Sequence, residues 1–400
     1  MQGLDHIDRY DWVILGGTEA ARQGAEFAAN QGARVALVEA IAQTQDFSQD
    51  FPRLGQLMRA GVDVMLEDWL WERSPIAGKF SRLWSRRPPW LVRTETRWLW
   101  GDRYLYAQPR SPQVPRAIQQ SDRPLLFPAD LDNYLAQRSQ DGKPKKHWAV
   151  LGGDIAAIAC AQRLARGGDQ VILLLPNHCL VPGLFSPADR YLQNLLETDG
   201  IDIVWDVPLE TFTPQDLPQE TDSILVATRP KPLASENGPR FATHHGQAIA
   251  SPYLQTSLSY FYLCGPALGG YSLPAIAEAE VLTAIAHGLG QPSRAIDYST
   301  LPWTIPTDPS ITQWGKTTPQ YNRPVLEIPC DDGGLLWLLW EKKWRSQSKI
   351  VGAAGVGQEA QRAIATLANL LSALGRSPTF DDLRKLPVPP ANLVHLRLMG

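Results

Sequence analysis

Residues 12–21 read WVILGGTEAA, and residues 148–157 read WAVLGGDIAA. In each copy an apolar run of strand length ends in two glycines, and an alanine-rich stretch of helical length follows. A second apolar run comes after each helix, RVALVE at 34–39 and QVILLL at 170–175. Strand, helix and strand in this order form the βαβ unit whose turn presents a helix N-terminus to a pyrophosphate. The sequence therefore predicts an α/β protein with two Rossmann-like units.

The first turn departs from the G-x-G-x-x-G template of dinucleotide-binding units. Gly16 and Ala21 fit its first and last positions, but Thr18 stands where the backbone must approach phosphate closely. We expect Gly16, Gly17, Thr18 and Ala21 to contact a cofactor, with the Thr18 hydroxyl donating to a phosphate. Glu39 ends the second apolar run, where an acid binds the ribose hydroxyls. The alternative is a βαβ unit that only packs.

The second turn fits a dinucleotide less well. Asp154 takes the position of close approach, where its carboxylate would repel a pyrophosphate. Leu175 stands where the ribose-binding acid is needed. NAD(P) binding is therefore not expected at this turn, and packing alone is the favoured interpretation.

Composition describes an ordinary globular chain. Its 400 residues are 44% hydrophobic with a formal net charge of -3, which suits two or three domains. No apolar run reaches the roughly 18 residues of a membrane span, so we expect a cytoplasmic protein. The acidic balance and the lack of a nucleic-acid-binding module argue against nucleic acid as a partner. The four cysteines are far apart and form no local pair, so no metal site is predicted.

Three later segments carry a resemblance to a known family. They are DSILVATRPKP at 222–232, YFYLCGPALGG at 260–270 and IDYSTLPWTIPTDPSITQWGKT at 296–317. Together with two βαβ units 136 residues apart, this order resembles the pyridine nucleotide-disulfide oxidoreductases. Within them the chain is most similar to the dihydrolipoamide dehydrogenase and mercuric reductase group.

The resemblance implies a three-part organisation. An FAD-binding-type domain would comprise 1–145 and 251–300, with an NAD(P)-binding-type domain inserted at 146–250. Residues 301–400 would form a C-terminal α+β dimerisation domain, which makes the protein a homodimer. FAD is then the expected cofactor, and Gly265 would join the first turn in binding it.

Several working parts of the family are missing from this chain. The redox cysteine pair should follow Glu39, but residues 40–51 read AIAQTQDFSQDF. Pro266 replaces the aspartate that holds the ribityl chain, and His395 is the only imidazole near the C-terminus. No catalytic residue is therefore assigned. Two hypotheses remain: a flavin-dependent oxidoreductase that does not act through a redox disulfide, and a non-catalytic homodimeric module for binding or assembly.

A segment rich in tryptophan and arginine, 69–103, stands apart from these motifs. Six tryptophans lie between Trp69 and Trp100, and polar and apolar residues alternate in WLVRTETRWLW, which is strand periodicity. One interpretation is a β-meander with an aromatic face on the core. The other is a surface for a protein or membrane partner, since tryptophan and arginine dominate interface hot spots.

Overall fold

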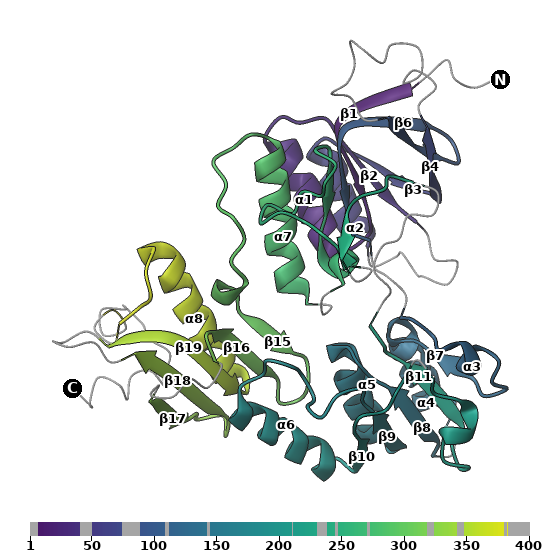
Figure 1. Ribbon diagram of the computed structural model, residues 1–400, viewed down its shortest axis with the longest axis vertical. Helices are drawn as coiled ribbons and strands as arrows, with labels where there is room; N and C mark the ends of the chain where they lie inside the picture. The colour runs from purple at the N-terminus through teal and green to yellow at the C-terminus, as the bar shows by residue number, and fades with distance from the viewer. Residues whose placement is uncertain are drawn as a thin grey trace. The chain divides into compact units, whose positions relative to one another are not determined.

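The structure is a computed structural model of the whole chain (Figure 1). It describes residues 7–40, 50–73, 89–108, 112–141, 145–209, 211–229, 238–244, 247–269, 273–317, 324–341, 348–379 and 382. The chain divides into two compact units, each described separately below. Unit 1 comprises Met1–Ser111 and Pro230–Asp297, and unit 2 comprises Pro112–Arg229 and Tyr298–Gly400. The predicted boundaries of three domains stay a prediction.

Unit 1 is built on a seven-stranded sheet with the order β3-β2-β1-β6-β5-β4, in which β14 also pairs with β6. Its strands are β1 (Ile7–Leu15), β2 (Val35–Glu39), β3 (Val62–Leu66), β4 (Trp69–Arg73), β5 (Trp90–Thr94), β6 (Trp98–Tyr106) and β14 (Phe261–Leu263). Its helices are α1 (Glu19–Asn30), α2 (Phe51–Arg59) and α7 (Pro274–Gly288), and β12 (Thr243–His244) and β13 (Gln247–Ala248) form a small hairpin.

Alternating side chains of β1 divide the core of unit 1 into two layers. Trp12 and Ile14 pack with α1 and α7, which lie side by side in Figure 1. Val13 and Leu15 point to the opposite face, as successive strand residues do. All four side chains are fully buried, so both faces of β1 are covered at this end. This explains the continuous apolar run in the sequence.

The tryptophan-rich segment forms the antiparallel end of this sheet, where β4 pairs with β5 and β5 with β6. Trp71 packs edge-on against Tyr104, with ring centroids 5.2 Å apart, and also contacts Phe261. Arg73 lies over the ring of Trp90, and Arg93 over that of Trp98. The predicted strands are confirmed among the described residues, and these arginines cover tryptophan rings of their own chain.

Unit 2 contains two five-stranded sheets. The first has the order β10-β9-β8-β11-β7 and is parallel, and the second has the order β15-β16-β19-β18-β17 and is antiparallel. Strands of the first are β7 (Leu125–Leu126), β8 (His147–Leu151), β9 (Gln170–Leu174), β10 (Ile201–Val204) and β11 (Ser223–Val226), with helices α3 (Arg116–Gln119), α4 (Leu131–Asp141), α5 (Ile155–Arg166) and α6 (Ser186–Thr198). Strands of the second are β15 (Trp303–Ile305), β16 (Ile311–Gly315), β17 (Val325–Pro329), β18 (Leu335–Glu341) and β19 (Lys349–Val356), with helix α8 (Gln358–Leu374). The predicted α/β fold is confirmed.

Two buried glutamines join the two sheets of unit 2. The Gln313 side chain on β16 accepts a hydrogen bond from the Phe185 N–H and donates one to the Gly183 carbonyl. The Gln162 side chain on α5 likewise accepts from the Asp308 N–H and donates to the Asp308 carbonyl. Since each amide satisfies backbone groups of the neighbouring element, the two sheets form one packed body.

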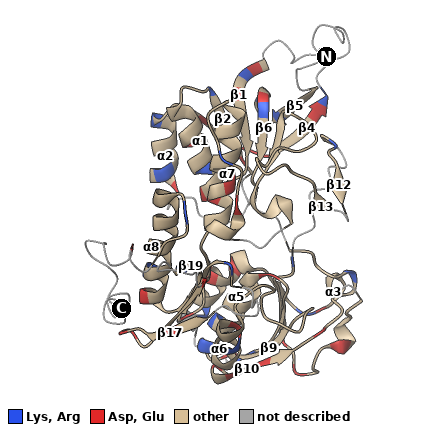
Figure 2. Ribbon diagram, turned by 60° about the vertical axis from the view of Figure 1, so that its left-hand side comes forward, with Lys and Arg blue, Asp and Glu red and all other residues tan. Residues whose placement is uncertain are grey.

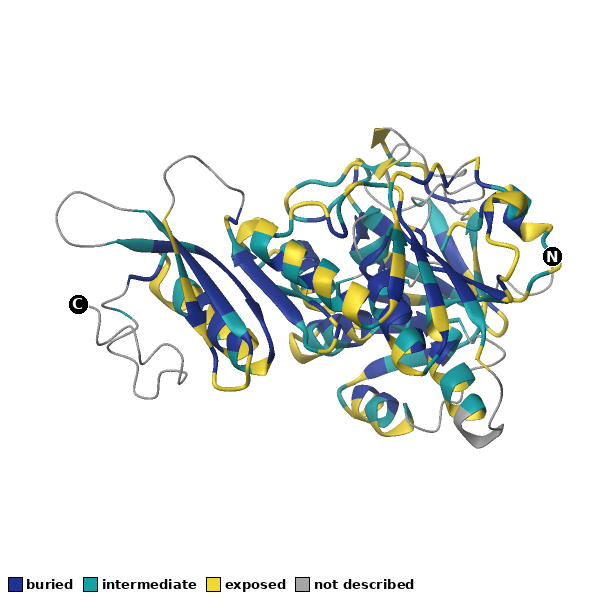
Figure 3. Ribbon diagram, turned by 90° about the horizontal axis from the view of Figure 1, so that it is seen from below, coloured by how far each residue is buried: buried dark blue, intermediate teal, exposed yellow. Residues whose placement is uncertain are grey.

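The apolar face of α8 is buried within unit 2. Ile364 and Leu367 of α8 pack against Leu336 and Leu338 of β18, and all four are fully buried. Figure 3 shows the helix beside the C-terminal sheet with one buried and one exposed face. Its own sheet therefore covers the apolar face of α8. No helix of the described chain has the length and apolar character needed to cross a bilayer.

Candidate functional site

The first Gly-Gly turn lies at the carboxyl end of β1, between the strand and α1. Gly16 has φ +140°, and a Cβ there would come within 2.6 Å of the carbonyl carbon and oxygen of Ala107. The Ala107 N–H donates to the Leu15 carbonyl, which holds the chain after β6 against the turn. Only glycine fits this position, because both the positive φ and the close backbone exclude a side chain.

Thr18 caps α1 rather than facing solvent with a spare hydroxyl. Its Oγ1 accepts a hydrogen bond from the Ala21 N–H at 3.2 Å, and its hydroxyl donates to the Ala107 carbonyl at 3.1 Å. A hydroxyl has a single hydrogen, and in the structure Thr18 donates it to Ala107. No hydrogen of this hydroxyl is then left for the predicted donation to a phosphate. Ala21 is fully buried, which lets α1 pack close to the sheet.

The backbone of this turn carries the donors that a phosphate would use. Among the described residues, no acceptor pairs with the N–H groups of Gly17, Thr18 or Glu19. They lie in the turn and first position of α1, where helical N–H groups have no partner within the helix and the dipole favours an anion. The first turn can therefore bind an anion through backbone alone.

Glu39, the expected ribose ligand, is already paired. It ends β2 and is 5% exposed, and Nη2 of Arg22 donates to its two carboxylate oxygens at 2.9 and 3.1 Å. Arg22 is 6% exposed, and its Nη1 donates to Asp50 at 2.8 Å. Burial opposes the charged form, but the hydrogen bonds to Asp50 and Glu39 raise the pKa of Arg22 above its ordinary value. The carboxylate also covers Gly17, whose added Cβ would fall 2.0 Å from Oε1.

Sequence reasoning missed Arg22, although a signal was present. The buried face of α1 otherwise carries small residues, among them Ala21, Gly24, Ala25 and Ala28. A lone arginine among such residues needs a buried acid as its partner, because an unpaired charge is costly to bury. Glu39 is the buried acid at the end of the strand beside this helix.

In the second turn, two of the three corresponding donors have partners within the chain. The Asp154 N–H donates to the Ala227 carbonyl, and the Asp154 carboxylate accepts from the Ile155 N–H at 2.7 Å. Leu175 is buried, and its Cδ2 lies 2.7 Å from where a Cβ on Gly152 would stand. The side chain at the expected ribose position therefore packs on the turn itself. In this turn the second glycine, Gly153, has the positive φ, at +133°, whereas in the first turn it is the first glycine, Gly16.

Comparisons with known proteins agree on one family. No protein-family model matches the chain. Over 191 residues it is 26% identical to dihydrolipoyl dehydrogenase of Bacillus subtilis (strain 168). The matched stretch covers 43% of this chain and 40% of that relative. LpdA from Mycobacterium tuberculosis superposes with a TM-score of 0.75 at 16% identity, over 98% of this chain and 100% of LpdA. The resemblance to the pyridine nucleotide-disulfide oxidoreductases is confirmed.

A second solved structure has the same fold. It is a Cu(II) complex of a mutant of RclA, an HOCl-induced flavoprotein disulfide reductase from Escherichia coli, with a TM-score of 0.74 at 17% identity. It covers 98% of this chain and 99% of RclA. At such identities the structural matches establish the fold alone, and the sequence match spans less than half of the dehydrogenase. The first turn of this chain lies in unit 1, and the assignment of an FAD-type domain stays a prediction.

The thiols of this chain differ from a redox pair of that family. None of the four cysteines forms a disulfide bond. Burial raises the pKa of Cys160 to about 12 and raises that of Cys264 well above its ordinary value. A reactive thiol needs the opposite shift, because the thiolate is the nucleophile. Residues 41–49, where the sequence lacks the expected pair, lie outside the described residues, as does His395.

Gly265 lies at the start of the helical turn that follows β14. It has φ +63°, and its N–H donates to the buried carboxylate of Glu280 on α7. Pro266 follows directly, so this turn offers no carboxylate of its own and no N–H at that position. Binding of a cofactor by Gly265 stays a prediction.

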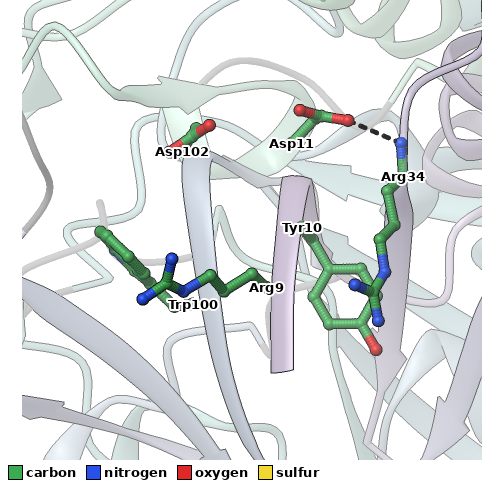
Figure 4. A pocket seen from close by; sticks show the side chains of 6 residues that line it. All are labelled: Arg9, Tyr10, Asp11, Arg34, Trp100 and Asp102. Carbon is green, nitrogen blue, oxygen red and sulfur yellow. Dashed lines mark hydrogen bonds between the residues drawn. The ribbon is translucent and has the colours of Figure 1, made fainter. Parts of the chain in front are cut away.

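A shallow polar depression of about 200 Å³ lies elsewhere in unit 1 and is lined by residues of β1, β6 and the start of β2 (Figure 4). Arg9 stacks on Trp100, and Arg34 stacks on Tyr10, with 5.0 and 4.9 Å from the guanidinium carbon to the ring centroid. Asp11 accepts from the Arg34 N–H. Because the arginines lie against aromatic neighbours of their own chain, we assign no cofactor to this depression.

One cluster in unit 2 combines groups that can ligate metals. Cys330, Asp332 and Glu359 bring ligand atoms within 4.8 Å of one another. The Asp332 carboxylate accepts from the N–H groups of Gly334 and Glu359, and so caps the first turn of α8. Partial burial acts to raise the pKa of Asp332, but its backbone hydrogen bonds outweigh this and lower the pKa. Capping of the helix therefore explains an acid at this position. We assign no metal to it.

Proposed function

We propose that the chain is an FAD-binding protein of the flavin oxidoreductase type, which works without a redox disulfide and without NAD(P)H. The observation that carries the proposal is the contrast between the two turns. The first leaves the N–H groups of Gly17, Thr18 and Glu19 without acceptors in the described chain, whereas in the second the N–H groups of Asp154 and Ile155 both have acceptors.

The residues of the first turn fit the two halves of the adenosine diphosphate group differently. The backbone donors fit the pyrophosphate. Because Gly16, Gly17 and Ala21 are small, the turn packs closely between its strand and its helix. Glu39 fits the ribose by its position at the end of β2, but Arg22 holds its carboxylate. A bound flavin would supply the redox chemistry, and the chain would bind and orient it.

The experiment is to purify the protein and measure its flavin content by absorbance, before and after incubation with excess FAD. We expect bound FAD after incubation. Protein that stays colourless at every FAD concentration would leave the second candidate, a non-catalytic homodimeric module for binding or assembly. The cysteine-free sequence of residues 40–51 favours that candidate.

Nicotinamide nucleotides should not bind. Because Leu175 fills the ribose position and Asp154 caps its own helix, calorimetric titration with NADH or NADPH is expected to show no micromolar binding. As a matched test, Leu175→Ala should leave the flavin content unchanged. Micromolar affinity for either nucleotide would contradict this prediction.

We also propose that the protein is a cytoplasmic homodimer. Support for the homodimer comes from the resemblance to the family. The apolar face of α8 adds no support, because it is buried within unit 2. The edge strand β17, with Val325 exposed, is a surface that a second copy would cover. Light scattering at micromolar concentration should give twice the mass of one chain, and the mass of one chain would refute the proposal.

Other partners fit the surface less specifically. In the view of Figure 2, Lys and Arg are interleaved with Asp and Glu along the described elements, and the formal net charge is -3, which does not favour nucleic acid. A protein or a membrane surface that binds the segment 69–103 would meet the exposed Leu70 on the edge strand β4. We place this partner second to the flavin.

A further inference from the structure

The described part of unit 1 holds a buried ion pair at the point where the adenosine ribose of a dinucleotide would be recognised. Arg22 donates from one nitrogen to both oxygens of Glu39. A ribose presents two hydroxyl donors to the same two oxygens. The arginine therefore makes, within the chain, the hydrogen bonds that a ribose would make from outside.

We propose that Arg22 is an internal competitor for the adenosine ribose, so that a ligand containing adenosine binds the first turn only by displacing the guanidinium from Glu39. This inference rests on the proposed flavin function and adds its regulation. Without a ligand, Arg22 occupies the position of the ribose beside Glu39. The affinity for FAD is therefore lower than it would be if the carboxylate were open.

The burial of the pair supports competition rather than a shared site. Glu39 is 5% exposed and Arg22 is 6% exposed, so little of the carboxylate is open to a ligand. Asp50 holds a second nitrogen of the same guanidinium, which keeps the arginine in place. The carboxylate lies directly over Gly17, within the turn whose N–H groups have no acceptor in the described residues.

The arginine also has a reason to leave. Its Nε is buried, and the described chain offers it no hydrogen-bond acceptor. A guanidinium that moves out to water recovers this bond, whereas the backbone donors of the turn gain a phosphate. Displacement by a ligand that has both a phosphate and a ribose is therefore favoured over displacement by either group alone.

The test titrates the full-length protein with FAD, ADP and FMN. Arg22→Ala should lower the Kd for FAD and for ADP at least tenfold, and should leave FMN, which lacks adenosine, unchanged. Arg22→Lys keeps a cation beside Glu39 and should stay within threefold of the unmodified protein. Arg53→Ala is the matched control, because Arg53 pairs with Glu19 and Glu26 on the outer side of α1.

Each outcome decides between the two proposals. Equal or weaker FAD binding by Arg22→Ala, with the unmodified protein binding FAD, would overturn the competition and leave the flavin function standing. Binding of neither FAD nor ADP by any variant would overturn both. If Arg22→Ala does not fold, the double variant Arg22→Ala/Glu39→Gln removes the buried charge and keeps an acceptor. It should also bind FAD more tightly than the unmodified protein, and failure to do so would refute the competition.

Discussion

Glu39→Ala should both destabilise the protein and remove its capacity for flavin. The change leaves the Arg22 guanidinium buried with only Asp50 as its partner, and breaking a buried pair from one side costs about 3 kcal/mol or more. It also removes the acid that would bind the ribose hydroxyls. We expect a lower denaturant midpoint by circular dichroism and no flavin after incubation with FAD.

Glu39→Gln separates the two effects. The amide keeps an oxygen that accepts from Arg22 or from one hydroxyl, so the variant should lose less stability and retain weak flavin binding. Leu175→Ala in the second turn serves as the control for flavin binding. Full flavin binding by Glu39→Ala would show that Glu39 is a structural partner of Arg22 and nothing more.

Gly16→Ala should be more damaging than the same change in the second turn. The new Cβ would lie 2.6 Å from backbone atoms of Ala107, and the residue would have to keep φ +140°. Strain of this kind and overpacking each cost about 1 to 3 kcal/mol, so the sum is about 2 to 6 kcal/mol. Chemical denaturation followed by circular dichroism measures the loss.

Gly152→Ala is the matched comparison, because Gly152 aligns with Gly16 in the repeat. Its Cβ would meet the end of the Leu175 side chain, which can rotate, and its φ lies outside the left-handed region. Overpacking alone predicts about 1 to 3 kcal/mol. Equal losses at Gly16 and Gly152 would mean that the two turns are conformationally equivalent after all.

Much of the fold follows from local pattern. The apolar runs and alanine-rich stretches predicted both βαβ units, and α1 and α5 begin at Glu19 and Ile155, again 136 residues apart. Periodicity predicts these elements because each depends on residues that are neighbours in sequence. The later segments indicated the family by the same local spacing, and the comparisons confirmed it.

The state of the site depended on residues that are distant in sequence. In the first turn the Thr18 hydroxyl donates to the carbonyl of Ala107, just after β6, and in the second the Asp154 N–H donates to the carbonyl of Ala227, just after β11. The repeat therefore looks symmetric in sequence, but in the described chain the first turn keeps the N–H groups of Thr18 and Glu19 without acceptors, whereas those of Asp154 and Ile155 in the second turn are paired. No local pattern reports which atom of the turn bonds to a residue that lies tens of positions away in the sequence.

The sequence by itself determined that the chain has two strand-turn-helix units, which glycines form the turns and where an acid ends the first unit. The tertiary structure alone decided that Arg22 holds Glu39, and that the sheet covers the apolar face of α8. The physical reason is the range of the interactions involved. Helices, strands and turns are encoded by adjacent residues, whereas the partner of a buried charge or an apolar face is set by how separate elements pack.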